Sequence, residues 1–367
     1  MITRQQFIHA GAALVATPLS LQGCNSSGES GSYEAAVKQI WQPATGKFES
    51  AQALRHELVR YATLAPSGHN TQSWKFHVEQ DAISILPDFT RRTPVVDPDD
   101  HHLFVSLGCA LENLAQASLA FGLKSLAQFD AAKDVVTVKL AQTAASSSPL
   151  FKAITDRQCT RGLFDAKPLS VLELKALEFA GTGDGVSVVL FTATPEMEKL
   201  LDFVTQGNTA QLSDEAFVKE LKYWLRFGAS DAIETGDGLY SATSGNPSVP
   251  RWLGSPMFDI LFSAKSENDK YASQVRSSSG IAVFVSEVND KAHWIEAGRC
   301  YERFALLATS ISVRNAMLNQ AVEVPAQRQK LADFLGIKSG RPNLVVRFGR
   351  GAKMPSSLRR STGSVLI

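Results

Sequence analysis

Two long helical patterns in this chain resemble each other at an offset of 190 residues, and they constrain the fold more than any other feature. Residues 102–123 and 294–313 both place apolar side chains at helical spacing, and a strand-like run precedes each, at 83–86 and at 281–285. The aligned positions are Gly108, Glu112 and Leu114 in the first pattern and Gly298, Glu302 and Phe304 in the second. The repeat predicts an α+β fold built from two tandem related halves. Coincidence is the alternative, since any buried core helix carries a similar pattern.

The halves are predicted at residues 35–149 and 150–367, on either side of a spacer rich in Ala and Ser. Further helices are expected at 54–64 and at 171–179, the second with Ser170 as its N-cap. The expected strands are residues 76–86, 135–140, 186–191 and 344–348. Residues 214–254, a helical run followed by several glycines and a proline, are predicted to form a surface lid, and residues 356–367 a basic tail.

The first 24 residues read as an export signal. A short segment carrying Arg4 precedes an apolar run at residues 10–21, which is too short to span a bilayer but suits the core of a signal peptide. Residues 21–24 resemble a bacterial lipobox with Cys24 as the lipidation point, and residues 3–7 resemble a twin-arginine (Tat) motif. The chain is therefore expected in the periplasm or cell envelope, anchored by lipid at Cys24, with a Ser/Gly linker at residues 25–34. An unprocessed amphipathic N-terminus is the alternative.

Composition excludes several classes of function. Lys and Arg number 37 against 36 Asp and Glu, and no long basic stripe occurs, which argues against nucleic-acid binding. The four cysteines form no C-x-x-C pair, so neither a zinc site nor a disulfide framework is predicted. Cys109 and Cys300 lie in apolar helical runs and are expected to be buried.

A polar loop joins the helix at 54–64 to the strand that follows it. Pro66 and Gly68 break the helix, while Ser67, Asn70 and Gln72 offer hydroxyl and amide groups that both donate and accept hydrogen bonds. Because the loop holds no carboxylate, it suits a planar, amide-like heterocycle better than a metal ion or a scissile ester. The alternative is an ordinary polar connection.

A second polar site contains two arginines four residues apart. On a helix, Arg157 and Arg161 would share one face, and two guanidinium groups at that spacing can clamp one phosphate. Arg359 and Arg360 near the C-terminus could complete the charge balance. A solvated charged face is the alternative, because acidic residues flank the pair.

The residues of these two sites resemble the motifs of a known family. Residues 65–76, read as A-P-S-x-x-N-x-Q-x-W-x-F, resemble the signature of nitroreductase-like flavoproteins, and His69 before Asn70 is similar to the Acg subfamily. Residues 154–169 resemble the phosphate motif R-x-S-x-R of that family, with Cys159 in the Ser position. Ser73 departs from the family pattern, which has Pro there. The resemblance covers nearly all of residues 35–367.

The resemblance implies a nitroreductase-like fold in which the usual homodimer is fused into one chain, a monomeric pseudo-dimer with one FMN. By the same resemblance the FMN phosphate would be held by Arg157, Gln158, Cys159, Arg161, Arg359 and Arg360. The isoalloxazine would be held by Pro66, Ser67, His69, Asn70 and Gln72. No protein residue is expected to be catalytic, because the flavin would pass a hydride from NAD(P)H or another donor to a nitroaromatic, quinone or similar acceptor.

Two other functions stay open at this point. The chain could bind or store FMN with little turnover, its site covered by residues 214–254, as an Acg-like protein would. It could also be a non-catalytic envelope lipoprotein whose flavin site has decayed.

Overall fold

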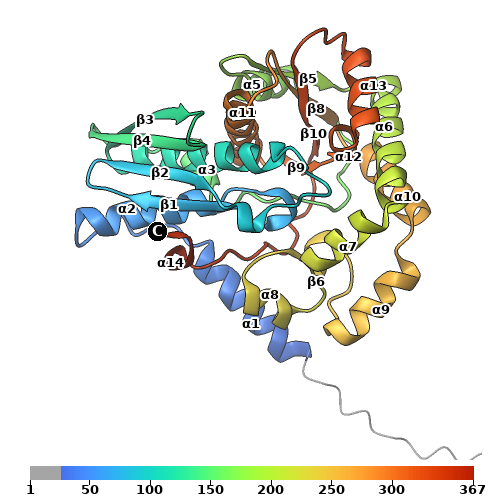
Figure 1. Ribbon diagram of the computed structural model, residues 1–367, viewed down its shortest axis with the longest axis horizontal. Helices are drawn as coiled ribbons and strands as arrows, with labels where there is room; N and C mark the ends of the chain where they lie inside the picture. The colour runs from blue at the N-terminus through green and yellow to red at the C-terminus, as the bar shows by residue number, and fades with distance from the viewer. Residues whose placement is uncertain (1–25) are drawn as a thin grey trace, which may run out of the picture.

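The computed structural model describes residues 26–367, so the signal segment and Cys24 lie outside the described residues (Figure 1). Two four-stranded antiparallel sheets form the framework, and their strand orders match. The first sheet has the order β1 (Trp74–Val78), β2 (Ala82–Pro87), β4 (Val135–Gln142), β3 (Leu123–Asp130). The second has the order β5 (Val186–Phe191), β8 (Gly280–Ser286), β10 (Arg341–Gly349), β9 (Arg314–Met317).

The helices repeat between the halves as the strands do. One helix precedes the first strand of each sheet, α2 (Ala51–Thr63) and α5 (Val171–Ala180), and a long helix follows the second strand, α3 (His101–Ala120) and α11 (Lys291–Ser310). The chain therefore runs helix, strand, strand, helix, strand, strand twice. This shared topology accords with the tandem repeat predicted from the sequence, and the α+β class is confirmed.

The two long helices pack against each other at the centre of the molecule, between the sheets (Figure 1). Their contact is reciprocal at two glycines. A Cβ on Gly108 would lie 1.9 Å from the carbonyl oxygen of Ile295, and a Cβ on Gly298 would lie 1.9 Å from that of Val105. Only glycine allows the two backbones to come this close. The four positions keep the offset of 190 residues, so the crossing lies on a local pseudo-two-fold axis.

By length and composition α3 could cross a membrane, but 78% of its most apolar window is buried inside the fold, as expected for a core helix. One hydrophobic core contains residues of both halves, including Phe104 of α3 and Phe304 of α11. Cys109 and Cys300 are buried in it, as predicted.

The second half differs from the first by a long insertion. A tight turn joins β1 to β2, whereas residues 192–279 separate β5 from β8. The insertion contains α6 (Thr194–Leu212), α7 (Glu215–Trp224), β6 (Leu225–Arg226), α8 (Ala229–Thr235), β7 (Leu239–Tyr240), η3 (Ser241–Ser244), α9 (Arg251–Leu261) and α10 (Ala264–Arg276). With α12 (Gln320–Glu323) and α13 (Pro325–Leu335), α6 and α10 cover the outer face of the second sheet. Both faces of β8 are therefore covered, which explains its continuous apolar sequence.

Most predicted elements are confirmed within a few residues, with three corrections. The run at 76–86 is not one strand but the hairpin β1–β2, because Gln80 and Asp81 form a turn. The helix expected at 102–123 ends at Ala120, and Leu123 begins β3. The predicted linker at 25–34 enters α1 (Ser26–Ile40), whose Tyr33 packs against Tyr240. The remaining short elements are η1 (Gly68–Asn70), η2 (Phe89–Arg91), α4 (Pro149–Ala153) and α14 (Thr362–Val365).

We predict that Gly108→Ala lowers the free energy of unfolding by about 1–3 kcal/mol, because the added methyl group forces α3 and α11 apart. Gly298→Ala should cost about as much, and the double variant less than the sum, since both methyl groups act on one crossing. Urea unfolding measures these values. Gly363→Ala is the control, because a Cβ there meets no atom within 4 Å. Equal stability of Gly108→Ala and Gly363→Ala would contradict the close crossing.

Candidate functional site

A cavity of about 460 Å³ lies where the two halves meet the insertion. Val105 and Cys109 of α3 and Tyr301 of α11 line it from the helix pair. Of the predicted site residues, the cavity wall contains Pro66, Ser67, His69, Cys159 and Arg161. The predicted lid contributes apolar side chains, among them Phe217, Leu221, Phe227, Leu239 and Val249. The remaining predicted site residues are not among those that line the cavity: Asn70, Gln72, Arg157, Gln158, Arg359 and Arg360.

The polar loop has an unusual backbone. Its residues His69, Asn70 and Gln72 have φ angles of 48°, 53° and 54°, in the left-handed region that non-glycine residues rarely adopt. Such strain persists where surrounding contacts hold it, and it concentrates at functional sites. The Ser67 hydroxyl accepts a hydrogen bond of 2.9 Å from the Gln72 backbone N–H, which fixes one end of the loop against the other.

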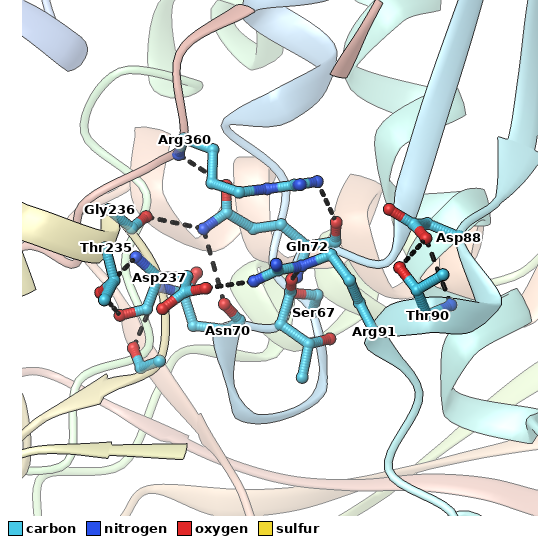
Figure 2. A network of polar contacts seen from close by, with 12 residues as sticks. Ser67, Asn70, Gln72, Asp88, Thr90, Arg91, Thr235, Gly236, Asp237 and Arg360 are labelled. Carbon is cyan, nitrogen blue, oxygen red and sulfur yellow. Dashed lines mark hydrogen bonds and ion pairs between the residues drawn. The ribbon is translucent and has the colours of Figure 1, made fainter. Parts of the chain in front are cut away.

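The amides of Asn70 and Gln72 bind the protein's own backbone. Asn70 Nδ2 donates to the carbonyl oxygens of Gly238 at 3.0 Å and Leu358 at 3.2 Å. Gln72 Nε2 donates to Gly236 at 2.8 Å, while Gln72 Oε1 accepts from the Arg360 N–H at 2.8 Å. Figure 2 shows Gln72 between Gly236 and Arg360. The side chains predicted to face a heterocycle thus join the loop to the insertion and to the C-terminal tail.

Arg359 closes this junction from the C-terminal side. Its guanidinium is buried and donates to the carbonyl oxygens of Thr63, Leu64 and Ala65, which are left open at the end of α2, and to Asn70 Oδ1. Burial, reinforced by the nearby Arg157, lowers the pKa of Arg359 to about 9. These donors are engaged within the protein, so Arg359 has a structural role in place of the predicted phosphate contact.

Gln158 and Arg360 also hold the tail. Gln158 pairs with the backbone of Met354, donating to its oxygen at 3.0 Å and accepting from its N–H at 2.7 Å. The Arg360 guanidinium donates to the Gln72 carbonyl at 2.8 Å and faces Arg91, Asp88 and Asp237. The predicted convergence of Arg360 with Arg157 and Arg161 is therefore not seen.

Arg157 and Arg161 do not share a helix face. The helix α4 ends at Ala153, and residues 154–156 form a turn, because the chain must leave the helix to run beside β9. Arg157 is buried, 3.0 Å from the Glu302 carboxylate, and donates to the Leu64 carbonyl at 2.9 Å. Burial raises the pKa of Glu302 to about 7, and Arg157 opposes that rise. Arg157 thus links the two halves instead of facing the cavity.

Arg161 is the arginine that reaches the cavity, and the protein holds its backbone from three sides. The preceding Thr160 N–H donates to Asn315 of β9 at 2.8 Å, Gln274 Nε2 donates to the Arg161 carbonyl at 2.6 Å, and Arg347 donates to Thr160 and Gly162. Across residues 26–367, no side chain pairs with the Arg161 guanidinium. The half-buried cation is therefore available to an anion.

Arg347 adds a second positive charge behind this wall, and sequence reasoning missed it. It is fully buried on β10, lies 4.1 Å from the centre of the Phe164 ring and has no carboxylate partner in the described chain. Burial lowers the pKa of Arg347 to about 10, so it stays protonated at neutral pH. An arginine inside an apolar strand was the available signal. Arg161 and Arg347 together favour a negative group at this end of the cavity.

His69 lies on the cavity wall with its Nδ1 buried and without a hydrogen-bond partner among the described residues. Burial, the Arg161 guanidinium and the His102 ring lower the pKa of His69 to about 4, so the ring is neutral at neutral pH. An unpartnered buried polar atom is a position that a ligand can satisfy.

A polar cluster in the cavity wall, close to the polar loop, was also missed. His102 Nε2 lies 3.6 Å from the Glu323 carboxylate, which accepts a hydrogen bond of 2.6 Å from Gln211. All three residues line the cavity, but they come from α3, α12 and α6, and no local pattern joins them. The described residues contain no group of His, Cys, Asp and Glu that could hold a metal ion.

Comparison with known proteins gives relatives at low identity, and no family model matches the chain. The chain is 23% identical over 337 residues to the "Putative NAD(P)H nitroreductase" proteins Rv3131 and MT3217 of two Mycobacterium tuberculosis strains, covering 87% of this chain and 92% of each relative. A nitroreductase with bound FMN from Bacteroides fragilis is 14% identical and matches 60% of this chain and 99% of its own, with a TM-score of 0.37. The nitroreductase NfnB from Mycobacterium smegmatis, in complex with NADPH, is 12% identical and matches 55% and 87%, with a TM-score of 0.35.

We predict that Arg359→Ala lowers the free energy of unfolding by about 2–4 kcal/mol, because it leaves the buried carbonyl oxygens of Thr63 and Ala65 without the guanidinium donor. The variant should also expose residues 235–245 to proteolysis, since Asn70 loses its orientation. Denaturant unfolding and limited digestion measure the two effects. Arg276→Ala, which removes an exposed arginine, is the control and should change stability by less than about 1 kcal/mol. A wild-type digestion pattern for Arg359→Ala would refute the junction.

A second prediction concerns pH. Because the pKa of His69 is lower in the folded protein than in the unfolded chain, the unfolded chain binds more protons between about pH 4 and 6.5, and the contribution of His69 to stability falls as pH drops through that range. Asparagine tolerates the positive φ at this position and has no group that titrates in this range. We therefore expect the difference in unfolding free energy between His69→Asn and wild type to shift in favour of the variant by roughly 1–2 kcal/mol from pH 7.5 to pH 5. Unfolding curves at both pH values test this, and an unchanged difference would be the contrary result.

Proposed function

We propose that the chain is an FMN-dependent oxidoreductase of the nitroreductase type. The observation that carries the proposal is the half-buried Arg161 guanidinium, which lines a cavity of about 460 Å³ and has no partner among the described residues. The volume lies in the range of about 300–1,000 Å³ that is usual for cofactor sites. The 23% identity to proteins named as NAD(P)H nitroreductases, over most of both chains, adds support.

The cavity residues fit FMN by their chemistry. Arg161, with Arg347 behind it, suits a phosphate group, and His69 Nδ1 and the Ser67 hydroxyl suit polar atoms of an isoalloxazine edge. Apolar side chains of the lid, such as Phe217 and Leu221, would cover the ring faces and exclude water. FMN, when bound, supplies the two-electron redox chemistry. The proposed donor is NAD(P)H, and the proposed acceptor is a nitroaromatic, a quinone or a similar molecule.

A second candidate is an FMN-binding or storage protein with little turnover, the alternative that the resemblance to the Acg subfamily left open. The observation that favours it is the predicted lid: residues 214–254 contribute much of the cavity wall and could keep a dinucleotide out. We further propose that the chain acts as a monomer, since both halves of the family's dimer would be present in one chain.

An anaerobic titration separates the two candidates. Addition of NADPH or NADH to the FMN-loaded protein should bleach the flavin absorbance near 450 nm, in about one equivalent per bound FMN. A flavin that stays oxidised with both donors, but is reduced by dithionite, would exclude the NAD(P)H-dependent oxidoreductase and leave FMN binding or storage as the function. A protein that binds no FMN would exclude both.

We predict that Arg161→Ala raises the Kd for FMN about ten- to a hundredfold, because the phosphate loses a charged partner worth about 1.5–3 kcal/mol. The Kd for riboflavin, which has no phosphate, should change little. Arg157→Ala should instead lower the free energy of unfolding by about 3–5 kcal/mol, because it leaves Glu302 buried without its partner. Flavin fluorescence titration and urea unfolding measure these effects, with Arg276→Ala as a control for both. Equal loss of FMN and riboflavin binding in Arg161→Ala would show that Arg161 does not hold the phosphate.

A further inference from the structure

An apolar stripe on the outer face of α9 faces solvent. Trp252, Pro256 and Ile260 are four residues apart and therefore lie on one side of the helix. All three are exposed, and Trp252 and Ile260 keep 76% and 80% of their surface accessible. Large exposed apolar side chains gathered on one helix face mark a contact with a partner or a membrane.

The inner face of the same helix belongs to the cavity. Gly254 packs on the Phe227 side chain, and Gly254, Met257 and Phe258 line the cavity. The helix α9 is therefore a wall one helix thick, with the cavity on one side and the apolar stripe on the other.

The position of α9 relates this stripe to the N-terminus of the described chain. At its start, Arg251 lies 3.6 Å from Asp231 of α8, and Ala229 and Ala232 of α8 pack in one cluster with Tyr33 of α1. Figure 1 shows α1, α8 and α9 at the same end of the molecule and α5 at the opposite end. Because α1 begins at Ser26, the predicted lipidation point Cys24 is two residues from this end.

Charge around α9 does not favour an anionic surface. Arg251 pairs with Asp231, and Lys222 pairs with Asp259 at 2.7 Å, so each of these two basic side chains already has an acidic partner in the protein. A surface of this kind would insert Trp and Ile side chains into the boundary of a bilayer instead of binding head groups by charge.

We propose that the outer face of α9 contacts a lipid bilayer to which Cys24 tethers the chain, so that one cavity wall faces the membrane. The surface carries Trp252 and Ile260, which suit the interface between head groups and acyl chains. This part of the inference rests on the proposed function. The electron acceptor would be an apolar molecule dissolved in the bilayer, such as a lipid-soluble quinone, which reaches the cavity past α9.

Vesicle binding by residues 25–367 tests the proposal. This chain contains every described element and lacks both the signal segment and any acyl group, so binding reports on the folded surface alone. The probe is intrinsic fluorescence, because Trp252 is exposed whereas the other tryptophans, Trp41, Trp74, Trp224 and Trp294, are buried. With phosphatidylcholine vesicles we expect a blue shift, quenching by brominated lipid, and co-flotation that persists at high salt.

Two double variants, one on α9 and one on α5, test which surface binds the vesicles. Trp252→Ser/Ile260→Ser should weaken partitioning about tenfold or more, measured by flotation, because it removes the inserted apolar surface. Leu172→Ser/Phe179→Ser is the matched control on α5, where the side chains are 80% and 87% exposed at the other end of the molecule, and it should leave partitioning within about twofold of wild type. All four positions are exposed, so thermal unfolding should stay unchanged and verifies the fold.

Three outcomes would overturn the proposal: no vesicle binding by the parent chain, equal binding by both double variants, or loss of binding in the α5 variant. A change of oligomeric state in the Trp252→Ser/Ile260→Ser variant, seen by size-exclusion chromatography, would instead identify α9 as a contact between copies of the chain. Because vesicle binding needs neither FMN nor an electron donor, these outcomes are independent of the test of the proposed function.

Discussion

The crossing of α3 and α11 is the contact on which the rest of this structure depends. Gly108 and Gly298 let each helix meet a backbone carbonyl of the other, so the two halves share one hydrophobic core instead of forming separate domains. Each helix also packs on the sheet of its own half. The cavity lies against this pair, with Val105 and Tyr301 in its wall, so the distance between the helices sets the position of that wall. A site assembled from both halves is a direct consequence of the close approach.

The polar loop after α2 is the second determinant, because three segments far apart in sequence meet there. Asn70 and Gln72 bind the backbone at residues 236–238 and at 358–360, and Arg359 holds the end of α2. These contacts maintain left-handed backbone at three non-glycine residues. Within the loop, the Asn70 and Gln72 amides bind the protein itself, whereas Ser67 and His69 line the cavity.

Local patterns predicted much of the fold and part of the site. Helical and strand periodicity located α3, α11, β5 and α5, and the repeat anticipated two halves with one topology. The roles of Arg157 and Arg359 could not be predicted, because their partners, Glu302 and the carbonyl oxygens at the end of α2, are more than a hundred residues away. The cluster of His102, Gln211 and Glu323 was missed for the same reason, since only tertiary packing brings α3, α6 and α12 together. Arg161, by contrast, was assigned to the site from its motif and does reach the cavity.

The proposed function requires that both halves of one chain build a single flavin site. Native mass spectrometry of the purified protein, after saturation with FMN and removal of the excess, tests it most directly. We expect one FMN on a monomeric chain, because the polar loop of the first half lines the cavity with Pro66, Ser67 and His69, whereas the corresponding turn of the second half, residues 181–185, is a short connection into β5. Two FMN per chain, one FMN shared by two chains, or none at all would contradict it.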